Sequence, residues 1–438
     1  MTIAFYADDF TGAVDSMLQY RRAGLTGVLS TGFHEESARA DRSQEPGGAL
    51  SCLGIGDTRQ MPDVIGIAGV ARSLTTSALD GEVRKAFALL AATGARVIQY
   101  KACSTVDSSP ERGSLGRVCE LAIEQFGPQP IAAVFAQPAF GRFTFFGHHF
   151  AAENGQVFRL DRQPTMSSHP VTPMAESELA VHLGAQTDLA ISTLSWPILD
   201  SAASTGDPSQ VNRAISDDEA GIVICDAFTE EHLEIIGRSI IAGVRSTDPR
   251  FVLGAGGISF GIGRAMEGEA SSLPGSAGTA DGPCLVLSGS RSPQTWAQIE
   301  AAVAQGWRCF DLRSRHAIAE AVAQHTAGHN TILQTTDPEG PNIVETEIVE
   351  GLATAGRMCL ERRPKTRVIL CGGDTCGAIL RSLRIGMLKL TAAPWGNVVL
   401  CEGEGPRGRV EVVLKGGQMG HTGLFEDIKH GGGLNEAW

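Results

Sequence analysis

The sequence predicts an α/β protein with two doubly wound domains, mainly parallel sheets and an interdomain cleft. Short apolar runs alternate with amphipathic stretches along the chain, as in sheets whose strands are joined by helices. Many of the 53 glycines stand where such a run passes into an amphipathic stretch. A polar stretch rich in Gly, Ser and Pro interrupts the pattern at residues 267–283, which predicts a linker.

The chain length and the position of the linker together predict the domains. A chain of 438 residues is long enough for two or three domains with large cores. We expect an N-terminal domain over residues 1–266, the linker over 267–283 and a C-terminal domain over 284–438.

Composition narrows the partners of the protein. The net charge of -13 disfavours a general surface for nucleic acid or anionic membrane, although a few local donors can still hold a small anion. No apolar run approaches the ~20 residues that a membrane span needs. The ten cysteines form no Cys-x-x-Cys pair and no short Cys/His cluster, so we expect buried free thiols in a reducing cytoplasm.

The first predicted strand, residues 3–6, leads directly to two acidic residues. Asp8 and Asp9 come at its carboxyl end, the edge where open α/β sheets bind ligands. Asp9 or Thr11 can instead cap the following helix, and we expect this of Thr11. One carboxylate then remains to act as a base or to bind a hydroxyl group.

Two further strand ends carry polar side chains. Residues 63–71 predict a strand that ends at Arg72, which either clamps a carboxylate or lies solvated on the surface. The strand at 96–100 leads to a loop, residues 101–113, dense in groups that suit a polyhydroxy acid, although a plain polar loop is the alternative. These groups are Lys101, Ser104, Thr105, Asp107 and Arg112. Residues 140–150 predict a lid or a hairpin, and we assign its histidines no chemistry.

The C-terminal domain contains three glycine-rich turns after predicted strands. Each turn offers backbone N–H groups to a phosphate, two of them at the start of a helix, and Lys415 adds positive charge. Each turn alone could equally be an ordinary loop, but three at the same sheet edge favour a phosphate site. The residues concerned are Ser288, Gly289, Ser290, Gly372, Gly373, Asp374, Thr375, Lys415, Gly416, Gly417 and Gly420.

With these residues in place, the chain resembles the four-carbon acid sugar kinases (tetronate and 3-oxo-tetronate kinases) over nearly its whole length. The resemblance rests on residues 8–12, 100–101, 137–140, 170–174, 288–290, 372–375 and 415–420. It implies an N-terminal domain that binds a sugar acid, a C-terminal domain that binds ATP, and catalysis between them.

Two departures from the family pattern concern the ligand loops. Family members commonly read Lys-Ser-Gly where this chain has Lys415, Gly416 and Gly417. Many carry a compact Asp-Ser-Thr-Leu-Arg-Gly where this chain has residues 103–113. Because that loop faces the acid, a related oxo or branched sugar acid fits as well as a tetronate.

The hypothesis is phosphoryl transfer from ATP to a hydroxyl of a small sugar acid. Asp9, or else Asp8, orients or deprotonates the hydroxyl, while Arg72, Lys101 or Arg112 binds the acid's carboxylate. The glycine turns hold the nucleotide, and Mg²⁺ bridges its phosphates, with Asp374 as a metal ligand directly or through water.

Two alternatives from other classes have different requirements. A sugar-acid sensor without catalysis needs no intact nucleotide turns, yet all three turns keep their glycines. A nicotinamide-dependent dehydrogenase needs Gly-x-Gly-x-x-Gly opening a helix and an acidic residue about 20 positions later, which we do not find. The sequence allows a homodimer but does not fix the oligomeric state.

Overall fold

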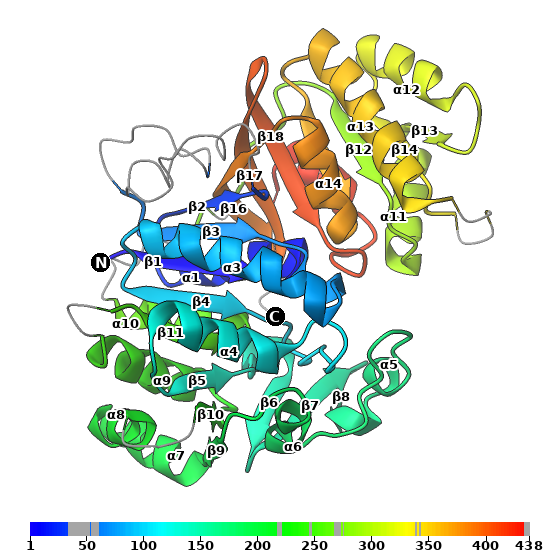
Figure 1. The fold of residues 1–438 in the computed structure, drawn as a ribbon. Helices are drawn as coiled ribbons and strands as arrows, with labels where there is room; N and C mark the ends of the chain where they lie inside the picture. The colour runs from blue at the N-terminus through cyan, green and yellow to red at the C-terminus, as the bar shows by residue number, and fades with distance from the viewer. Residues whose placement is uncertain are drawn as a thin grey trace. The chain divides into compact units, whose positions relative to one another are not determined.

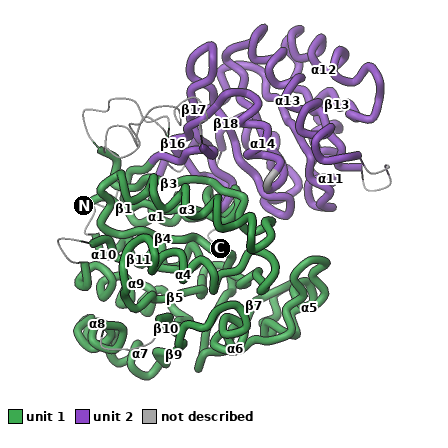
Figure 2. The backbone as a smooth tube through the Cα atoms, viewed as in Figure 1, with its two compact units in different colours: residues 1–27, 35–271 green, residues 28–34, 272–438 purple. Residues whose placement is uncertain are grey.

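The computed structural model describes residues 1–33, 53, 61–216, 221–244, 248–266, 273, 274, 276–337, 340 and 343–432. The chain forms two compact units, shown in Figure 2. Unit 1 comprises residues 1–27 and 35–271, and unit 2 comprises residues 28–34 and 272–438. The predicted linker falls partly outside the described residues, which omit 267–272 and 275.

Unit 1 alternates strands and helices, as Figure 1 shows. Its elements are β1 (Ile3–Ala7), α1 (Phe10–Arg22), β3 (Val64–Ala68), α3 (Thr76–Ala92), β4 (Val97–Lys101), α4 (Leu115–Phe126), β5 (Ile131–Val134), β6 (Arg142–Phe145), β7 (His148–Glu153), β8 (Gln156–Arg159), α5 (Pro164–Ser167), α6 (Leu179–Gly184), β9 (Ile191–Leu194), α7 (Trp196–Thr205), α8 (Ser209–Ser216), β10 (Ile222–Cys225), α9 (Glu230–Ala242), β11 (Arg250–Gly254) and α10 (Gly256–Ala265).

The main sheet of unit 1 is parallel, in the order β3-β1-β4-β11-β5-β10-β9. Strands β1, β3 and β4 are buried along their full length, which explains why they read as continuous apolar runs. Helices α3 and α4 pack against each other, and α10 packs against both α1 and α9. The sequence predicts this alternation because each strand and helix is a local pattern.

A separate antiparallel sheet, β6-β7-β8, is inserted after β5. The alternative of a hairpin at residues 140–150 is therefore confirmed. The turn between β6 and β7 contains Phe146 and Gly147, both with positive φ, and the Asp226 carboxylate accepts hydrogen bonds from both of their N–H groups. These two bonds fix the hairpin to the end of β10.

Unit 2 also combines strands and helices. Its elements are β2 (Gly27–Ser30), β12 (Cys284–Ser288), α11 (Pro293–Ala304), β13 (Arg308–Asp311), α12 (Ala317–Thr326), β14 (Thr331–Gln334), α13 (Glu345–Arg362), β15 (Arg367–Cys371), α14 (Asp374–Ser382), β16 (Met387–Trp395), β17 (Val398–Gly405), β18 (Gly408–Lys415) and α15 (Leu424–His430).

The sheet of unit 2 is mixed, in the order β13-β14-β12-β15-β18-β17-β16-β2. The first five strands are parallel, whereas β16 and β17 are antiparallel to their neighbours. The edge strand β2 comes from the start of the chain and pairs with β16, with Ser30 opposite Met387. The predicted α/β class and mostly parallel strands are therefore confirmed.

Some of the element boundaries expected from the sequence agree with the structure, and others differ. From the sequence, Pro293 fits the first position of a helix with Ser292 as its N-cap, and α11 begins in this way. The pattern of residues 251–257 predicts a single strand ending in glycines, but β11 ends at Gly254 and α10 begins at Gly256. The nine described cysteines are free, and seven of them are buried. Among the described helices, none has the length and apolar character that crossing a membrane requires.

Candidate active site

The carboxyl ends of five neighbouring strands in unit 1 meet at one edge. In the parallel register, Ala7 of β1 pairs with Ala68 of β3 and with Lys101 of β4, and Gly254 of β11 pairs with Lys101 and with Val134 of β5. The residues that follow these strands therefore lie close together, although they are far apart in sequence.

Two carboxylates and one guanidinium form the centre of this edge. Arg72 contacts Asp8 through Nη2 at 2.7 Å and through Nε at 3.2 Å, a bidentate pair. Its third nitrogen, Nη1, lies 2.6 Å from the Asp9 carboxylate. The two acidic residues and the arginine predicted from separate strand ends are thus in direct contact.

Asp9, not Thr11, caps helix α1. The Asp9 Oδ1 atom accepts a hydrogen bond of 2.6 Å from the Gly12 N–H group, whereas Thr11 lies in the first helical turn. The expectation that Thr11 caps the helix is therefore wrong, because the helix begins two residues earlier. Asp9 keeps its second oxygen for Arg72, and its side chain is 14% exposed against 2% for Asp8.

Burial and neighbouring charges shift the pKa values of Asp8 and Arg72 in opposite directions. Burial raises the pKa of the Asp8 carboxyl, and the Arg72 guanidinium offsets part of that rise while Asp9 adds to it. Burial also opposes the charge on Arg72, yet Asp8 and Asp9 hold its pKa well above its usual range. Arg72 is therefore engaged by the protein's own carboxylates and is not a solvated surface side chain.

Lys101 lies beside this centre and is almost fully buried. Its Nζ atom donates to the Ala102 carbonyl at 3.0 Å and lies 3.6 Å from the Asp15 carboxylate. The other Asp15 oxygen accepts a hydrogen bond of 3.0 Å from the Gln137 side chain. A Cβ atom at Gly12 would lie 3.0 Å from Lys101 Nζ, so glycine leaves room for the ammonium group.

The loop after β4 holds the remaining predicted residues of unit 1. Asp107 accepts a hydrogen bond from Thr172, and Thr105 Oγ1 lies 3.1 Å from Cys103 Sγ. Arg112 donates to the backbone carbonyl of Ser73, next to Arg72. The loop thus places Arg112 against the backbone segment that carries Arg72.

Two features fix the shape of that loop. Val106 is buried and has a φ of 54°, a left-handed conformation that is strained for a β-branched residue. His149 of β7 reaches across with Nε2 to the Ser104 carbonyl at 2.8 Å, while Nδ1 lies 2.9 Å from Thr144 Oγ1. Burial lowers the pKa of His149 to about 4, so the imidazole is neutral and serves as a tether.

Three residues at this edge of the sheet had no role predicted from the sequence. Gln137 and Thr172 stood within the family motifs, but neither carried a predicted role. Asp15 offered only one weak signal, which is that it follows Gly12 by three positions and so faces the same side of α1. The structure places Asp15 and Gln137 beside Lys101, and Thr172 against Asp107.

The three glycine-rich turns of unit 2 also come together. They follow β12, β15 and β18, which are adjacent and parallel, with Ser288 opposite Cys371 and Cys371 opposite Lys415. The Gly372 N–H donates to the Lys415 carbonyl at 3.0 Å, and the Gly289 N–H donates to the Cys371 carbonyl at 3.2 Å. Convergence of the turns, predicted from strand ends alone, is what the structure shows.

The glycines in these turns leave space that a side chain would fill. A Cβ atom at Gly289 would lie 2.8 Å from the Thr375 methyl group, and one at Gly417 would lie 2.8 Å from Ser290 Oγ. Gly372 has a φ of 138°, which favours glycine. The turns therefore place backbone without side chains next to the N-termini of α11 and α14. This arrangement suits the binding of a phosphate chain.

Lys415 does not extend outward from its turn. It is buried, and its Nζ atom contacts Thr295 Oγ1 at 2.8 Å and the carbonyls of Gly416 and Gly417 at 3.0 Å each. Burial lowers its pKa. Thr295 also donates to the Gly417 carbonyl at 2.7 Å, so lysine and threonine fasten the glycine turn from within.

A metal site is not built by side chains in the described ranges. No group of three or more His, Cys, Asp or Glu residues there is placed to hold an ion. The side chain of Asp374, the predicted ligand, lies outside what the structure describes. Gly373 and Thr375 complete the turn around it, and Gly420 ends the last turn with a φ of 78°.

Comparison with known proteins assigns a role to each half of the chain. Residues 3–262 match a family model described as a sugar-binding N-terminal domain, and residues 285–425 match one described as a nucleotide-binding C-terminal domain. The chain is 31% identical to a 3-oxo-isoapionate kinase of Paraburkholderia graminis, over 98% of this chain and 94% of that protein. It is 27% identical to a 3-oxo-tetronate kinase of Cupriavidus necator, over 96% and 95%.

Solved structures agree with the fold. A protein from Salmonella typhimurium LT2 superposes with a TM-score of 0.77 at 22% identity, covering 97% of this chain and 98% of that chain. A Haemophilus influenzae protein does so with a TM-score of 0.74 at 19% identity and the same coverage. The chain belongs to the four-carbon acid sugar kinase family, whose members are ATP-dependent sugar-acid kinases.

Proposed function

We propose that this protein transfers the γ-phosphoryl group of ATP to a hydroxyl of a small 3-oxo sugar acid. The observation that carries the proposal is the pair of carboxylates, Asp8 and Asp9, held by Arg72 at the sheet edge of the sugar-binding half. Phosphoryl transfer needs an oriented hydroxyl and neutralised charge more than covalent chemistry. A carboxylate fixed by a guanidinium and by a helix N-terminus can orient such a hydroxyl.

Asp9 is the residue that we assign to the attacking hydroxyl. Its carboxylate is the more exposed of the two, and Arg72 with the Gly12 N–H holds it in one orientation. Asp8 is almost fully buried and positions Arg72. Asp9 therefore accepts the hydroxyl proton as the new P–O bond forms, and ADP leaves with the electron pair of the broken P–O bond.

The acid's carboxylate needs cations that the protein has not already paired. Arg72 is taken by Asp8 and Asp9, and we therefore assign it a positioning role. Arg112 forms no ion pair with any described residue, and Lys101 Nζ lies 3.6 Å from the Asp15 carboxylate. We assign these two to the carboxylate, and Ser104, Thr105 and Asp107 to the hydroxyls of the acid.

The nucleotide belongs to the glycine turns of unit 2. Backbone N–H groups of these turns, residues 288–290, 372–375 and 416–420, offer hydrogen bonds to phosphate oxygens, apart from those that already donate to neighbouring carbonyls, as Gly289 and Gly372 do. Lys415 stabilises the last turn through its bonds to the carbonyls of Gly416 and Gly417. Mg²⁺ supplies charge neutralisation between the phosphates when bound, and Asp374 is its proposed ligand. A doubly wound arrangement of each domain remains part of this proposal.

The substrate class rests on the relatives and on the loop. Relatives named for a branched and for a linear 3-oxo acid both align over nearly the whole chain. Residues 103–113 depart from the compact loop of many tetronate kinases, and the strained Val106 gives the loop its own shape. A branched 3-oxo acid is therefore the first candidate.

The test is ADP release from ATP and Mg²⁺ with a panel of linear, branched and oxo sugar acids. The proposal expects release that depends on the acid and is fastest with a 3-oxo acid. Binding of an acid without ADP release would support the non-catalytic sensor instead. An absorbance change with NAD(P) would point to a dehydrogenase.

A further inference from the structure

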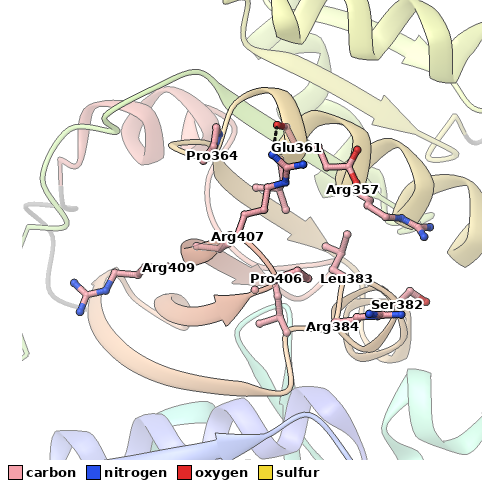
Figure 3. Close-up of a pocket in the computed structure, with 13 residues that line it drawn as sticks. Arg357, Glu361, Pro364, Ser382, Leu383, Arg384, Pro406, Arg407 and Arg409 are labelled. Atoms are coloured by element: carbon pink, nitrogen blue, oxygen red, sulfur yellow. Dashed lines mark hydrogen bonds between the residues drawn. The ribbon is translucent and has the colours of Figure 1, made fainter.

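A cavity of about 250 Å³ lies on unit 2, and none of the residues that line it belongs to the glycine turns. Figure 3 shows the lining side chains. The cavity is lined by the last turns of α13, the end of α14 and the turn between β17 and β18. Helix α14 starts at the Gly372–Thr375 turn and ends beside the cavity, so its nine residues, roughly 13 Å of helix, separate the two sites. Strand β18 spans the same interval in the opposite direction.

Four arginines and a single carboxylate line this cavity. The arginines are Arg357, Arg384, Arg407 and Arg409, and the carboxylate is that of Glu361. Arg409 is paired with Glu402 at 2.9 Å and extends away from the others in Figure 3. Over the described ranges, the other three arginines form no ion pair, and Arg407 donates to a backbone carbonyl, that of Glu361, at 3.5 Å. In a chain of net charge -13, this is a local excess of positive charge.

Arg384 occupies a backbone position where glycine is the usual residue. The Arg384 N–H donates to the Arg381 carbonyl at 3.0 Å, and the Ile385 N–H donates to the Leu380 carbonyl at 2.9 Å. This pair of bonds is a Schellman motif, and Arg384 takes its left-handed position with a φ of 57°. Glycine adopts that conformation more easily than arginine does. The side chain is therefore present in spite of the backbone, which indicates that the guanidinium has a use.

The floor of the cavity is apolar. Leu383, Ile385 and Val410 are buried beneath it, and Leu360 and Pro406 border it. A hydrated inorganic anion would leave this floor uncovered, whereas an organic group can lie on it. Guanidinium groups match the oxygens of a phosphate group by paired hydrogen bonds.

We propose that this cavity binds a small organic phosphate, a phosphomonoester whose carbon part lies on the apolar floor while arginines at its rim, Arg384 among them, pair with the phosphate. The ligand is distinct from the nucleotide at the glycine turns, and the proposal does not depend on the sugar-acid reaction. The small volume excludes a ligand as large as a dinucleotide.

The experiment is isothermal calorimetry on the full-length protein with phenyl phosphate as the probe, with the nucleotide turns saturated by a non-hydrolysable ATP analogue. Inorganic phosphate and benzyl alcohol supply the charged and the apolar parts separately. The informative variant is Arg384→Gly, which removes the guanidinium and relieves the left-handed backbone, so it is expected to fold at least as stably as the wild type. Arg362→Gln is the control, because Arg362 ends α13, a helix that borders the cavity, but does not line the cavity itself.

The proposal expects phenyl phosphate to bind more tightly than either fragment, with an affinity that falls about tenfold or more in Arg384→Gly and is unchanged in Arg362→Gln. Thermal unfolding of Arg384→Gly should occur at the wild-type temperature or above. No binding of phenyl phosphate, equal binding by both variants, or binding no tighter than that of inorganic phosphate would each overturn it.

Discussion

The two sheet edges that are candidate ligand sites differ in the groups that form them, which are side chains in unit 1 and main chain in unit 2. The unit 1 edge is built from charged side chains, with Asp8, Asp9 and Arg72 in direct contact at the ends of parallel strands. The unit 2 edge is built from backbone, with three glycine turns in register and its one lysine turned inward. A varied polyhydroxy acid is best recognised by side chains, whereas a phosphate chain common to all kinases can be recognised by the main chain.

This difference also has consequences for substitution. At the unit 1 edge, a single atom change in a side chain can remove chemistry while the fold stays intact. At the unit 2 edge, the functional atoms belong to the backbone, so only a change in the space around them can act. The following predictions test this contrast, starting from the largest expected effect.

Asp9→Asn should lower kcat by about 10²- to 10⁴-fold, because the amide cannot accept the hydroxyl proton. Asparagine still caps α1, so the helix and the ATP affinity should be unchanged. Steady-state kinetics and nucleotide titration measure the two effects. Asp207→Asn is the matched control, since Asp207 also accepts a bond from a helix-start N–H but lies at the surface. Near-normal turnover of Asp9→Asn would remove Asp9 from the mechanism.

Acidification should loosen the sugar loop through His149. The pKa of His149 in the folded protein, about 4, lies below its ordinary 6.5, so the unfolded chain takes up the proton first as the pH falls. The stabilisation is complete above pH 6.5 and is lost towards pH 4, by about 3 kcal/mol in the free energy of unfolding.

Denaturant titrations of wild type and His149→Gln over this pH range measure that loss. The variant should show a flatter pH dependence, whereas His316→Gln, at an exposed histidine, should follow the wild type. Parallel curves for wild type and His149→Gln would contradict the tether.

Lys415→Met should destabilise unit 2 by about 2 kcal/mol, because Thr295 Oγ1 and the carbonyls of Gly416 and Gly417 each lose one hydrogen-bond partner. Its effect on ATP affinity should follow from the loosened turn and stay below tenfold. Chemical unfolding and nucleotide titration give the two numbers, with Lys365→Met at the surface as control. A large loss of affinity at unchanged stability would mean that Lys415 contacts phosphate directly.

Gly289→Ala should weaken ATP binding by about tenfold, because the added methyl group meets Thr375 at 2.8 Å and displaces the turn. Binding of the acid should not change. Gly432→Ala is the control in the same unit, since nothing lies within 4 Å of the added atom. Equal ATP affinity in both variants would show that the Gly289 turn does not hold the nucleotide.

Sequence reasoning located both edges because each is a repeated local pattern. A buried strand, a turn and a helix cap are all encoded within about fifteen residues, so Asp8, Gly372 and Ser292 could be placed from their neighbours. Parallel pairing then brings such turns to one edge without further information.

Non-local pairing could not be predicted in this way. β2 joins β16, more than three hundred residues later in the chain, and its four residues carry no sign of that partner. The engagement of Arg72 by two carboxylates and the inward course of Lys415 depend on contacts between separate strands. Charge alone made both residues look like ligands for an anion.

Hydrogen–deuterium exchange with each ligand added separately tests the central claim, the division of labour between the two edges, most directly. The account predicts that a non-hydrolysable ATP analogue protects residues 288–290, 372–375 and 416–420, and that a 3-oxo sugar acid protects residues 8–12 and 101–113. Protection of the glycine turns by the acid, or of the carboxylate edge by the nucleotide alone, would contradict it.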